Sequence, residues 1–111
     1  MKPKSRENIG GRVYVASDGL KIKVGMSTRG KCLGRFSELK RQFDFYVKDS
    51  FITDRRFDYR IIEKMTHEKL SRFHLNHEFF SASFAEGIKA VKEVMQELDA
   101  LGFGGGVTQI K

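Results

Sequence analysis

Residues 12–25 read RVYVASDGLKIKVG, and in this segment two short runs rich in β-branched residues flank the dipeptide Asp18-Gly19. A two-residue Asp-Gly loop between such runs is the strongest short-range signal of a β-hairpin. Counting outward from this loop predicts cross-strand pairs of Ser17 with Leu20, Ala16 with Lys21, Val15 with Ile22, Tyr14 with Lys23, and Val13 with Val24. We therefore expect an N-terminal hairpin on which the other elements pack.

The two faces of this hairpin differ in character, because side chains alternate between the faces of a strand. One face is wholly apolar and consists of Val13, Val15, Ile22 and Val24. The other face is expected to be wet, and it sets the phenol of Tyr14 directly opposite the ammonium of Lys23. Such a pair is ordinary on a half-exposed strand, where a cross-strand contact contributes about 0.2–1 kcal/mol. Whether this pair has a functional role depends on which other polar residues lie beside it.

The length and charge of the chain limit the classes of protein to which it can belong. Its 111 residues suffice for one domain with a modest core. There are 21 Lys and Arg against 14 Asp and Glu, which gives a formal net charge of +7. This excess attracts polyanions, above all the phosphate backbone of nucleic acids. An anionic membrane surface or an acidic protein would suit the same charge.

Several classes of protein are disfavoured by the sequence. Cys32 is the single cysteine, so neither an intramolecular disulfide nor a CxxC zinc cluster can form. No apolar run approaches the ~20 residues that a membrane span requires. The basic N-terminus has no hydrophobic segment behind it of the kind found in secretory signals. We expect a cytoplasmic protein that binds no membrane.

Two helices and a third strand are predicted after the hairpin. Helical spacing indicates a first helix over about 31–43, with apolar residues Leu33, Phe36, Leu39 and Phe43. A third strand is expected at about 45–53. A second helix is expected from about 54 to 73, with an apolar arc of Phe57, Ile61, Ile62 and Met65. Its separate polar stripe consists of Tyr59, Glu63 and His67, spaced four residues apart.

The last part of the chain carries clearer signals. The run Glu78-Phe79-Phe80 predicts a short extended segment, and Ser83 with Glu86 has the spacing of a capping box. The helix that follows is expected to bury Phe84, Ile88, Val91, Val94, Met95, Leu98 and Leu101, and to stop at Gly102. We predict a flexible basic arm at 1–10, one domain at 11–101 and a flexible tail at 102–111. The fold class is α+β, a three-stranded sheet flanked by three helices.

The residues that carry polar chemistry occur in a familiar order. The chain contains Arg12-Val13-Tyr14, then Lys23-Val24-Gly25, then Arg35 in the first predicted helix and Glu63 in the second. In this order and spacing the sequence resembles the GIY-YIG nuclease superfamily, most of all its small phage-type branch with a Lys-Val-Gly second motif. The resemblance covers residues 11 to 95 and includes His67 and the late Glu78-Phe79-Phe80 run. Arg12 and Lys23 stand where the superfamily's motifs have glycine and tyrosine.

This resemblance implies a metal-dependent DNA endonuclease that hydrolyses phosphodiester bonds, with Glu63 holding Mg²⁺ or Mn²⁺. Tyr14, Lys23, Arg35 and His67 are the implied catalytic residues. A lysine across the strand is expected to lower the pKa of the Tyr14 phenol from its usual value near 10 and make it a better base. A guanidinium such as that of Arg35 suits the charge that builds up on a phosphate. His67 either orients the site, accepts a proton or does nothing.

Backbone contacts are expected from further basic residues. We predict that Arg12, Lys21, Arg29 and Lys31 bind the phosphates of DNA, and RNA would suit the same charges. One active site nicks one strand at a time, so a double-strand cut would need a dimer or two successive encounters. The sequence leaves the oligomeric state open. It contains no separate DNA-reading domain, so the choice of cleavage site would come from a partner or from DNA shape.

Other interpretations stay open at this stage. Arg35 would also fit a helix surface as the partner of Glu38, worth roughly 0.3 kcal/mol, and Tyr59 either lines a cleft or packs. Glu63 lies far from the centre of the predicted apolar arc, where a solvated glutamate is usual, so its role as a ligand rests on the resemblance. The whole domain would alternatively be a catalytically silent nucleic-acid-binding module, or a protein-interaction domain that interferes with another nuclease.

Overall fold

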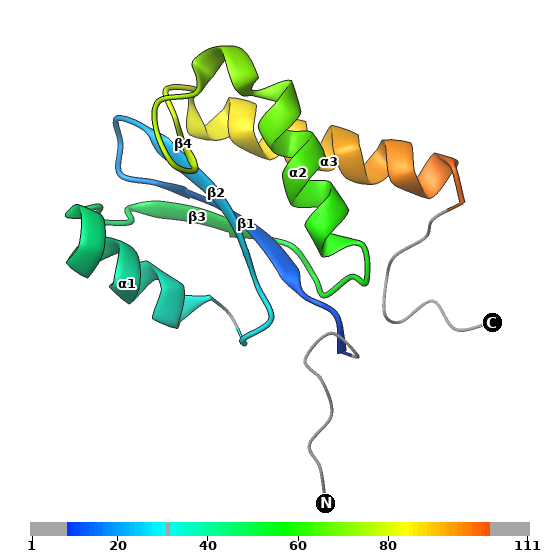
Figure 1. Ribbon diagram of the computed structural model, residues 1–111, viewed down its shortest axis with the longest axis horizontal. Coiled ribbons are helices and arrows are strands. Elements are labelled where there is room, and N and C mark those ends of the chain that lie inside the picture. Colours follow the sequence, from blue (N-terminus) through cyan, green and yellow to red (C-terminus); the bar gives the residue numbers. More distant parts are fainter. Residues whose placement is uncertain (1–8, 31, 103–111) are drawn as a thin grey trace, which may run out of the picture.

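The computed structural model describes residues 9–30 and 32–102, so Lys31 and most of the two predicted flexible ends lie outside the described residues. The elements follow the chain as β1 (Arg12–Ser17), β2 (Ile22–Ser27), α1 (Leu33–Phe43), β3 (Asp49–Ile52), α2 (Tyr59–Lys69), the 3₁₀ helix η2 (Ser71–Phe73), β4 (Phe79–Phe80) and α3 (Phe84–Ala100) (Figure 1). The predicted α+β class is confirmed. Within the described part of the chain, however, the sheet has four antiparallel strands, in the order β3-β1-β2-β4, where three were predicted.

The fourth strand is the short segment Phe79–Phe80. It pairs with β2 through Ile22 opposite Phe80 and Lys23 opposite Phe79. A strand of two residues is too short for the alternation that identifies strands in a sequence. The sequence therefore predicts an extended segment here, but it does not predict the pairing of this segment with β2.

The predicted register of the hairpin is wrong by two residues. Ser17 lies opposite Ile22, so the loop contains the four residues 18–21. The cause is Asp18, whose Oδ1 accepts hydrogen bonds from the backbone N–H of Leu20 at 2.8 Å and of Lys21 at 2.9 Å. The side chain thus closes a wider turn than the Asp-Gly dipeptide alone would make.

A shift by two residues keeps each side chain on its predicted face, because the period of a strand is also two. It does change the cross-strand partners. Tyr14 lies opposite Gly25, and Lys23 lies opposite Ala16. The predicted pairing of Tyr14 with Lys23 is therefore wrong, although both residues share one face.

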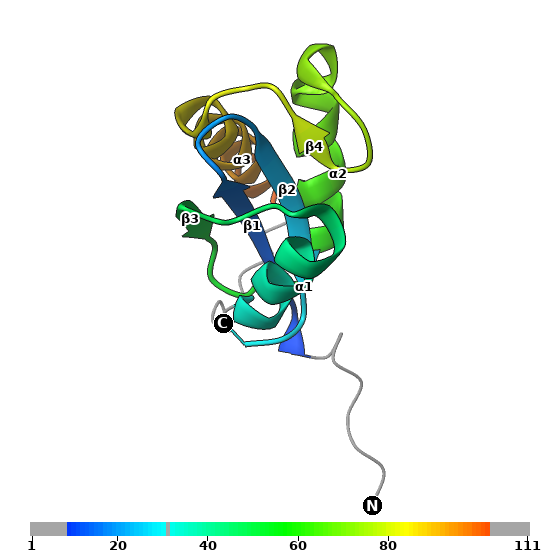
Figure 2. The same ribbon diagram turned by 90° about the vertical axis from the view of Figure 1, so that its left-hand side faces the viewer.

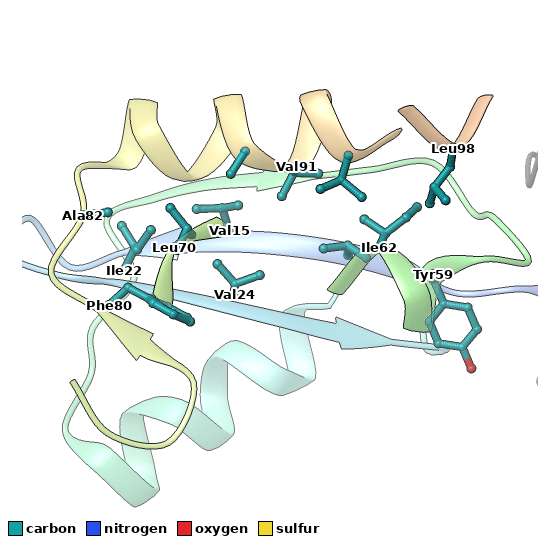
Figure 3. Packing of buried hydrophobic residues seen from close by; sticks show 13 residues of the cluster. Val15, Ile22, Val24, Tyr59, Ile62, Leu70, Phe80, Ala82, Val91 and Leu98 are labelled. Atoms are coloured by element: carbon teal, nitrogen blue, oxygen red, sulfur yellow. The ribbon is translucent and has the colours of Figure 1, made fainter. Parts of the chain in front are cut away.

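Helices cover both faces of the sheet (Figures 1 and 2). The apolar face predicted for the hairpin is confirmed, since Val13, Val15, Ile22 and Val24 are all buried. Figure 3 shows this main core, in which the strands pack against α2 and α3 through residues such as Ile62, Val91 and Leu98.

The opposite face of the sheet, expected to be wet, is also buried. Tyr14 and Ala16 have no exposed surface and form a second core with Leu39 of α1, Phe45 and Phe79. The position of Phe45 in this core, before β3, accounts for the third strand beginning at Asp49 rather than near residue 45. Placing α1 on this face removes Tyr14 from solvent.

The second helix begins later than predicted and faces another way. Arg56 pairs its backbone with Gly11 through hydrogen bonds of 3.0 and 2.9 Å, and a turn at residues 57–58 then leads into α2 at Tyr59. The helix buries Tyr59, Ile62, Glu63 and Thr66. Phe57 and Ile61 of the predicted apolar arc are instead exposed. The stripe expected to be polar and separate thus points into the protein.

The last helix follows its prediction closely. Ser83 Oγ accepts from the backbone N–H of Glu86 at 3.0 Å, and Glu86 Oε1 accepts from the backbone N–H of Ser83 at 2.9 Å, so the capping box is confirmed. The helix ends at Ala100, just before Gly102 with its φ of 85°. Leu101, beyond the last helical residue, is exposed, contrary to prediction, and so is Leu33 at the start of α1. Among the described residues, no helix has the length and apolar character needed to cross a membrane.

The contact of α3 with the hairpin gives a stability test. A Cβ on Gly87 would lie 2.7 Å from Ile22 Cδ1 and 2.8 Å from Val15 Cγ1. We expect Gly87→Ala to lower the free energy of unfolding by about 1–3 kcal/mol through overpacking. Gly34→Ala in α1, which meets only the end of the Arg29 side chain, serves as the matched control and should raise it by up to about 1 kcal/mol. Urea denaturation of both variants measures the difference, and equal effects would contradict this packing.

Candidate active site

The site lies at the outer edge of β2, where β4 begins. The backbone N–H of Val24 donates to the carbonyl oxygen of Glu78 at 3.2 Å, and the Val24 carbonyl accepts from His67 Nε2 at 2.9 Å. Through these two hydrogen bonds, Val24 of β2 holds both the start of β4 and the middle of α2. Beside it opens a cleft of about 460 Å³ whose wall includes Tyr14, Lys23, Arg35 and Glu78.

Tyr14 is fully buried on β1, and its ring packs over the backbone of Gly25. A Cβ on Gly25 would overlap the Tyr14 hydroxyl, so only glycine fits opposite this tyrosine. The ring also meets Phe36 edge-on, with centroids 5.4 Å apart. The buried Tyr14 Oη has no hydrogen-bond partner among the described residues. An unpaired buried hydroxyl of this kind calls for a ligand or a catalytic role.

The expected lowering of the Tyr14 pKa is wrong. Burial raises the pKa of Tyr14 far above its ordinary value, and the nearby charge of Arg35 only partly opposes this. The ammonium of Lys23 does not lie across the strand from the phenol, and it forms an ion pair with Glu78. Tyr14 is therefore a neutral phenol near pH 7.

Glu63, His67 and Glu78 form a carboxylate–imidazole cluster. One possible ligand atom from each lies within 4.8 Å of the other two. Glu63 is buried on the inner face of α2, against the expectation from periodicity that it would be solvated. Burial, followed by the negative charge of Glu78, raises the pKa of Glu63 to about 7. Its buried Oε2 makes no hydrogen bond within the described part of the chain.

This cluster fits a divalent cation. Two carboxylates and an imidazole are ligands that Mn²⁺ accepts, and the carboxylates suit Mg²⁺. A cation would neutralise Glu63 and Glu78 and would give Oε2 of Glu63 the partner it lacks. Glu78 was not among the predicted site residues. The Glu78-Phe79-Phe80 run was the only signal for it, because its approach to Glu63 depends on the pairing of β4 with β2.

The ring of His67 is held in a defined orientation. Because the Val24 carbonyl can only accept a hydrogen bond, Nε2 must carry the proton in this contact, and the lone pair is then on Nδ1. Nε2 lies 3.9 Å from Oε2 of Glu63, and the ring meets Phe80 edge-on with centroids 5.0 Å apart. His67 is therefore at the site, and its chemical role stays a prediction.

Arg35 forms the surface pair that one interpretation expects and also lines the cleft, while its catalytic role stays a prediction. Its Nη1 lies 2.8 Å from Oε1 of Glu38 on the same helix, as expected of a surface pair. Its side chain is 46% exposed, lines the cleft and places positive charge near Tyr14 and Glu63. Tyr59, the other open case, packs against Gly11, where a Cβ would lie 2.6 Å from its ring.

The predicted phosphate-binding residues are spread over the molecule. Arg12 donates from Nη1 to the Thr53 carbonyl at 2.9 Å, and Lys21 pairs with Asp18 in the hairpin loop at 3.1 Å. Arg29 is exposed and lines, with Arg35, a second hollow of about 280 Å³ next to the cleft. Lys31 lies outside the described residues. Their contact with nucleic acid stays a prediction.

The fold and site together define a small α+β domain whose cleft is lined by a phenol and two cations and shares Glu78 with a carboxylate–imidazole cluster. The chain belongs to the T5orf172 domain family, whose sequence model matches residues 11–98. This domain occurs in phage and bacterial proteins and is associated with nuclease-type proteins. No curated protein and no solved structure matches the chain.

The raised pKa of Glu63 predicts a dependence of stability on pH. The Glu63 carboxyl has a pKa of about 7 in the folded state and an ordinary pKa of 4.5 in the unfolded chain. Its protonation therefore stabilises the folded state fully below pH 4.5, and this contribution to the free energy of unfolding is lost as pH rises to about 7. We expect Glu63→Gln to remove this loss and to raise the free energy of unfolding at pH 8 by up to about 3 kcal/mol. Urea denaturation in EDTA measures it, with Glu68→Gln on the exposed side of α2 as control. A Glu63→Gln variant less stable than the wild type at pH 8 would contradict the burial argument.

Proposed function

We propose that this domain is a metal-dependent DNA endonuclease of the GIY-YIG type, which hydrolyses phosphodiester bonds and nicks one strand per active site. The observation that carries the proposal is the meeting of Tyr14, Lys23 and Arg35 with the Glu63–His67–Glu78 cluster at one edge of the sheet. These groups come from β1, β2, α1, α2 and the start of β4, so local sequence alone does not explain their convergence. Membership of a family associated with nuclease-type proteins supports the same conclusion.

The carboxylates of Glu63 and Glu78, with His67 beside them, are the residues that would hold Mg²⁺ or Mn²⁺. Bound there, the cation would supply Lewis-acid stabilisation of the leaving oxygen. Lys23 keeps the Glu78 carboxylate in place through its ion pair and adds positive charge to the cleft. This pairing gives the lysine a role at a position where the superfamily's motif has tyrosine.

Arg35 binds the phosphate in this proposal. Its half-exposed guanidinium opens onto the cleft and presents a planar fork to two phosphate oxygens. Negative charge on these oxygens increases as the phosphorus becomes five-coordinate, so the contact stabilises the transition state more than the bound substrate. Glu38 holds the arginine near the cleft before the substrate arrives.

Tyr14 accepts the proton of the attacking water. The water oxygen forms a bond to phosphorus, its proton passes to the phenolate oxygen of Tyr14, and the bond from phosphorus to the leaving oxygen breaks. The hydroxyl oxygen of Tyr14 is buried but has no hydrogen-bond partner among the described residues, and Tyr14 lines the cleft, so substrate binding has to open a path for the water to this oxygen. Because burial raises the pKa of Tyr14, only a small fraction of molecules carries the phenolate at neutral pH.

A catalytically silent nucleic-acid-binding module is the second candidate, and the neutral state of Tyr14 is the observation that favours it. The formal charge of +7 and the exposed arginines beside the cleft would serve binding alone equally well. The two candidates differ in a single measurable property, which is the breaking of a phosphodiester bond.

A plasmid-nicking assay distinguishes the endonuclease from the silent nucleic-acid-binding module. We expect the wild type to nick supercoiled DNA with Mg²⁺ or Mn²⁺ and to stop in EDTA. Arg35→Ala and Glu63→Gln should each lose about 100-fold or more in rate, because the first removes a cation at the phosphate and the second removes a carboxylate that would hold the metal. Arg41→Ala on α1 and Glu68→Gln on α2 are matched controls, exposed residues of the same helices, and should keep the rate. Wild-type binding without nicking in either metal would favour the silent module.

The pH dependence of nicking tests the role of Tyr14. Since its pKa is raised, the fraction of Tyr14 in the phenolate form increases throughout the alkaline range. We expect the rate to climb about tenfold per pH unit from pH 8 to 9 with Mg²⁺, above the range in which Glu63 titrates. Tyr14→Phe should abolish nicking while leaving DNA affinity within about twofold, since its hydroxyl is buried. A wild-type rate that levels off below pH 7 would assign the proton to another group.

A further inference from the structure

The cleft beside β2 has two chemically different ends. Its wall along α1 is a single helical face, made by Arg35, Glu38, Leu39, Gln42 and Phe43. At a rise of 1.5 Å per residue, Phe43 lies about 12 Å along the helix axis from Arg35. The end at Arg35 is ionic and is the one used in the proposed hydrolysis. The end at Phe43 is aromatic.

Three rings form the aromatic end. The centroid of Phe43 lies 5.2 Å from that of Phe79 and 5.3 Å from that of His77. Phe79 is buried in the second core and packs edge-on against the ring of Phe43. Phe43 is 39% exposed and His77 is exposed, so both present ring surface at the cleft. The exposed amide of Gln42 stands next to them and can both donate and accept a hydrogen bond.

The loop that carries His77 is held in a strained conformation. His77 has a φ of 50°, a left-handed backbone that costs energy for any residue with a Cβ. Hydrogen bonds on either side fix it: Leu75 N–H donates to the Phe79 carbonyl at 2.9 Å, and Phe79 N–H donates to the Asn76 carbonyl at 2.9 Å. The imidazole of His74 contacts the His77 carbonyl at 2.7 Å. The fold thus maintains a strained residue where its ring meets Phe43.

Hydrolysis of a phosphodiester bond requires no aromatic surface, since water, phosphate and metal are all polar. We propose that Gln42, Phe43 and His77 form a subsite for an unpaired nucleobase next to the scissile phosphate. Because the rings of Phe43 and His77 are tilted by 53° to each other, the base stacks on the Phe43 ring and meets the His77 ring edge-on. The Gln42 amide bonds to its polar edge. This inference rests on the proposed function and names its substrate class: nucleic acid with an unstacked nucleotide at the cut site.

The base must be unpaired for a physical reason. In a duplex both faces of each base are covered by its neighbours, so a ring in the protein can reach one only after the base leaves the stack. A cleft of about 460 Å³ has the volume of a small-ligand site and is large enough for one unstacked nucleotide. A mismatch, a bulge or a single-stranded end costs less energy to unstack than a paired base, which makes such sites the preferred targets.

Binding to three matched DNAs tests the subsite. The three are a fully paired duplex, the same duplex with one unpaired 2-aminopurine, and the same duplex with an abasic site in place of that base. Affinity is measured by fluorescence anisotropy in EDTA, where no cutting occurs. We expect the wild type to bind the unpaired base most tightly and to quench its fluorescence. Phe43→Leu should weaken this complex about fivefold or more and leave the other two unchanged.

Two further variants keep the test decisive. Phe57→Leu is the matched control, because Phe57 is 54% exposed and is not part of the cleft wall. His77→Asn removes a ring while keeping a residue that tolerates positive φ, and it should also weaken only the unpaired complex. Circular dichroism checks that each variant is folded.

The failure of this inference can be told from failure of the proposed function. If the wild type nicks plasmid DNA but binds the three DNAs equally, or if Phe43→Leu and His77→Asn weaken all three alike, the nucleobase subsite is overturned and the nuclease stands. If the wild type neither binds nor nicks any DNA, both are overturned. If it binds the unpaired base through Phe43 without nicking, the subsite stands on a silent nucleic-acid-binding module.

Discussion

The backbone of Val24 is the constraint on which the site depends. A buried N–H and a buried carbonyl each need a partner, and β4 is too short to supply both. The N–H takes the carbonyl of Glu78, and the carbonyl takes the imidazole of His67. These two bonds bring the start of β4 and the inner face of α2 to one point. Glu63, one helical turn before His67, therefore arrives beside Glu78. The neighbouring Gly25 leaves the space that the Tyr14 ring occupies.

The same arrangement works against folding. Within the described residues, four buried side-chain atoms lack a hydrogen-bond partner, and two of these, Tyr14 Oη and Glu63 Oε2, belong to the site. A third, Thr66 Oγ1, lies one turn after Glu63 on α2. Each such group costs free energy, and a charged carboxylate costs most. The apolar core on the other side of the hairpin must offset this. A cluster that weakens the fold yet is held by several elements is what a ligand site requires, because the ligand supplies the missing partners.

The sequence predicted most reliably what depends on short-range patterns. The apolar face of the hairpin, the capping box at Ser83 and the stop at Gly102 each rest on a few neighbouring residues. The predicted register of the hairpin is wrong because hydrogen bonds to the Asp18 side chain, not the Asp-Gly dipeptide, determine the turn. The orientation of α2 was predicted wrongly because docking turns the helix so that Ile62 of the apolar arc stays buried together with Tyr59 and Glu63, while other members of the arc are exposed. Glu78 was missed as a site residue for the same reason, since only its tertiary pairing brings it to Glu63.

A single face of α1 lines both ends of the cleft, and this has a consequence for substrate choice. Within the proposed nuclease domain, the cleft itself can discriminate between sites on nucleic acid. The ionic end attracts any phosphate and cannot distinguish one site on DNA from another. The aromatic end is filled only where a nucleotide can leave its stack, and that cost depends on local pairing. Because the rigid helix joins the two ends, filling one positions the other, and deformability of the nucleic acid takes the place of sequence as the property recognised.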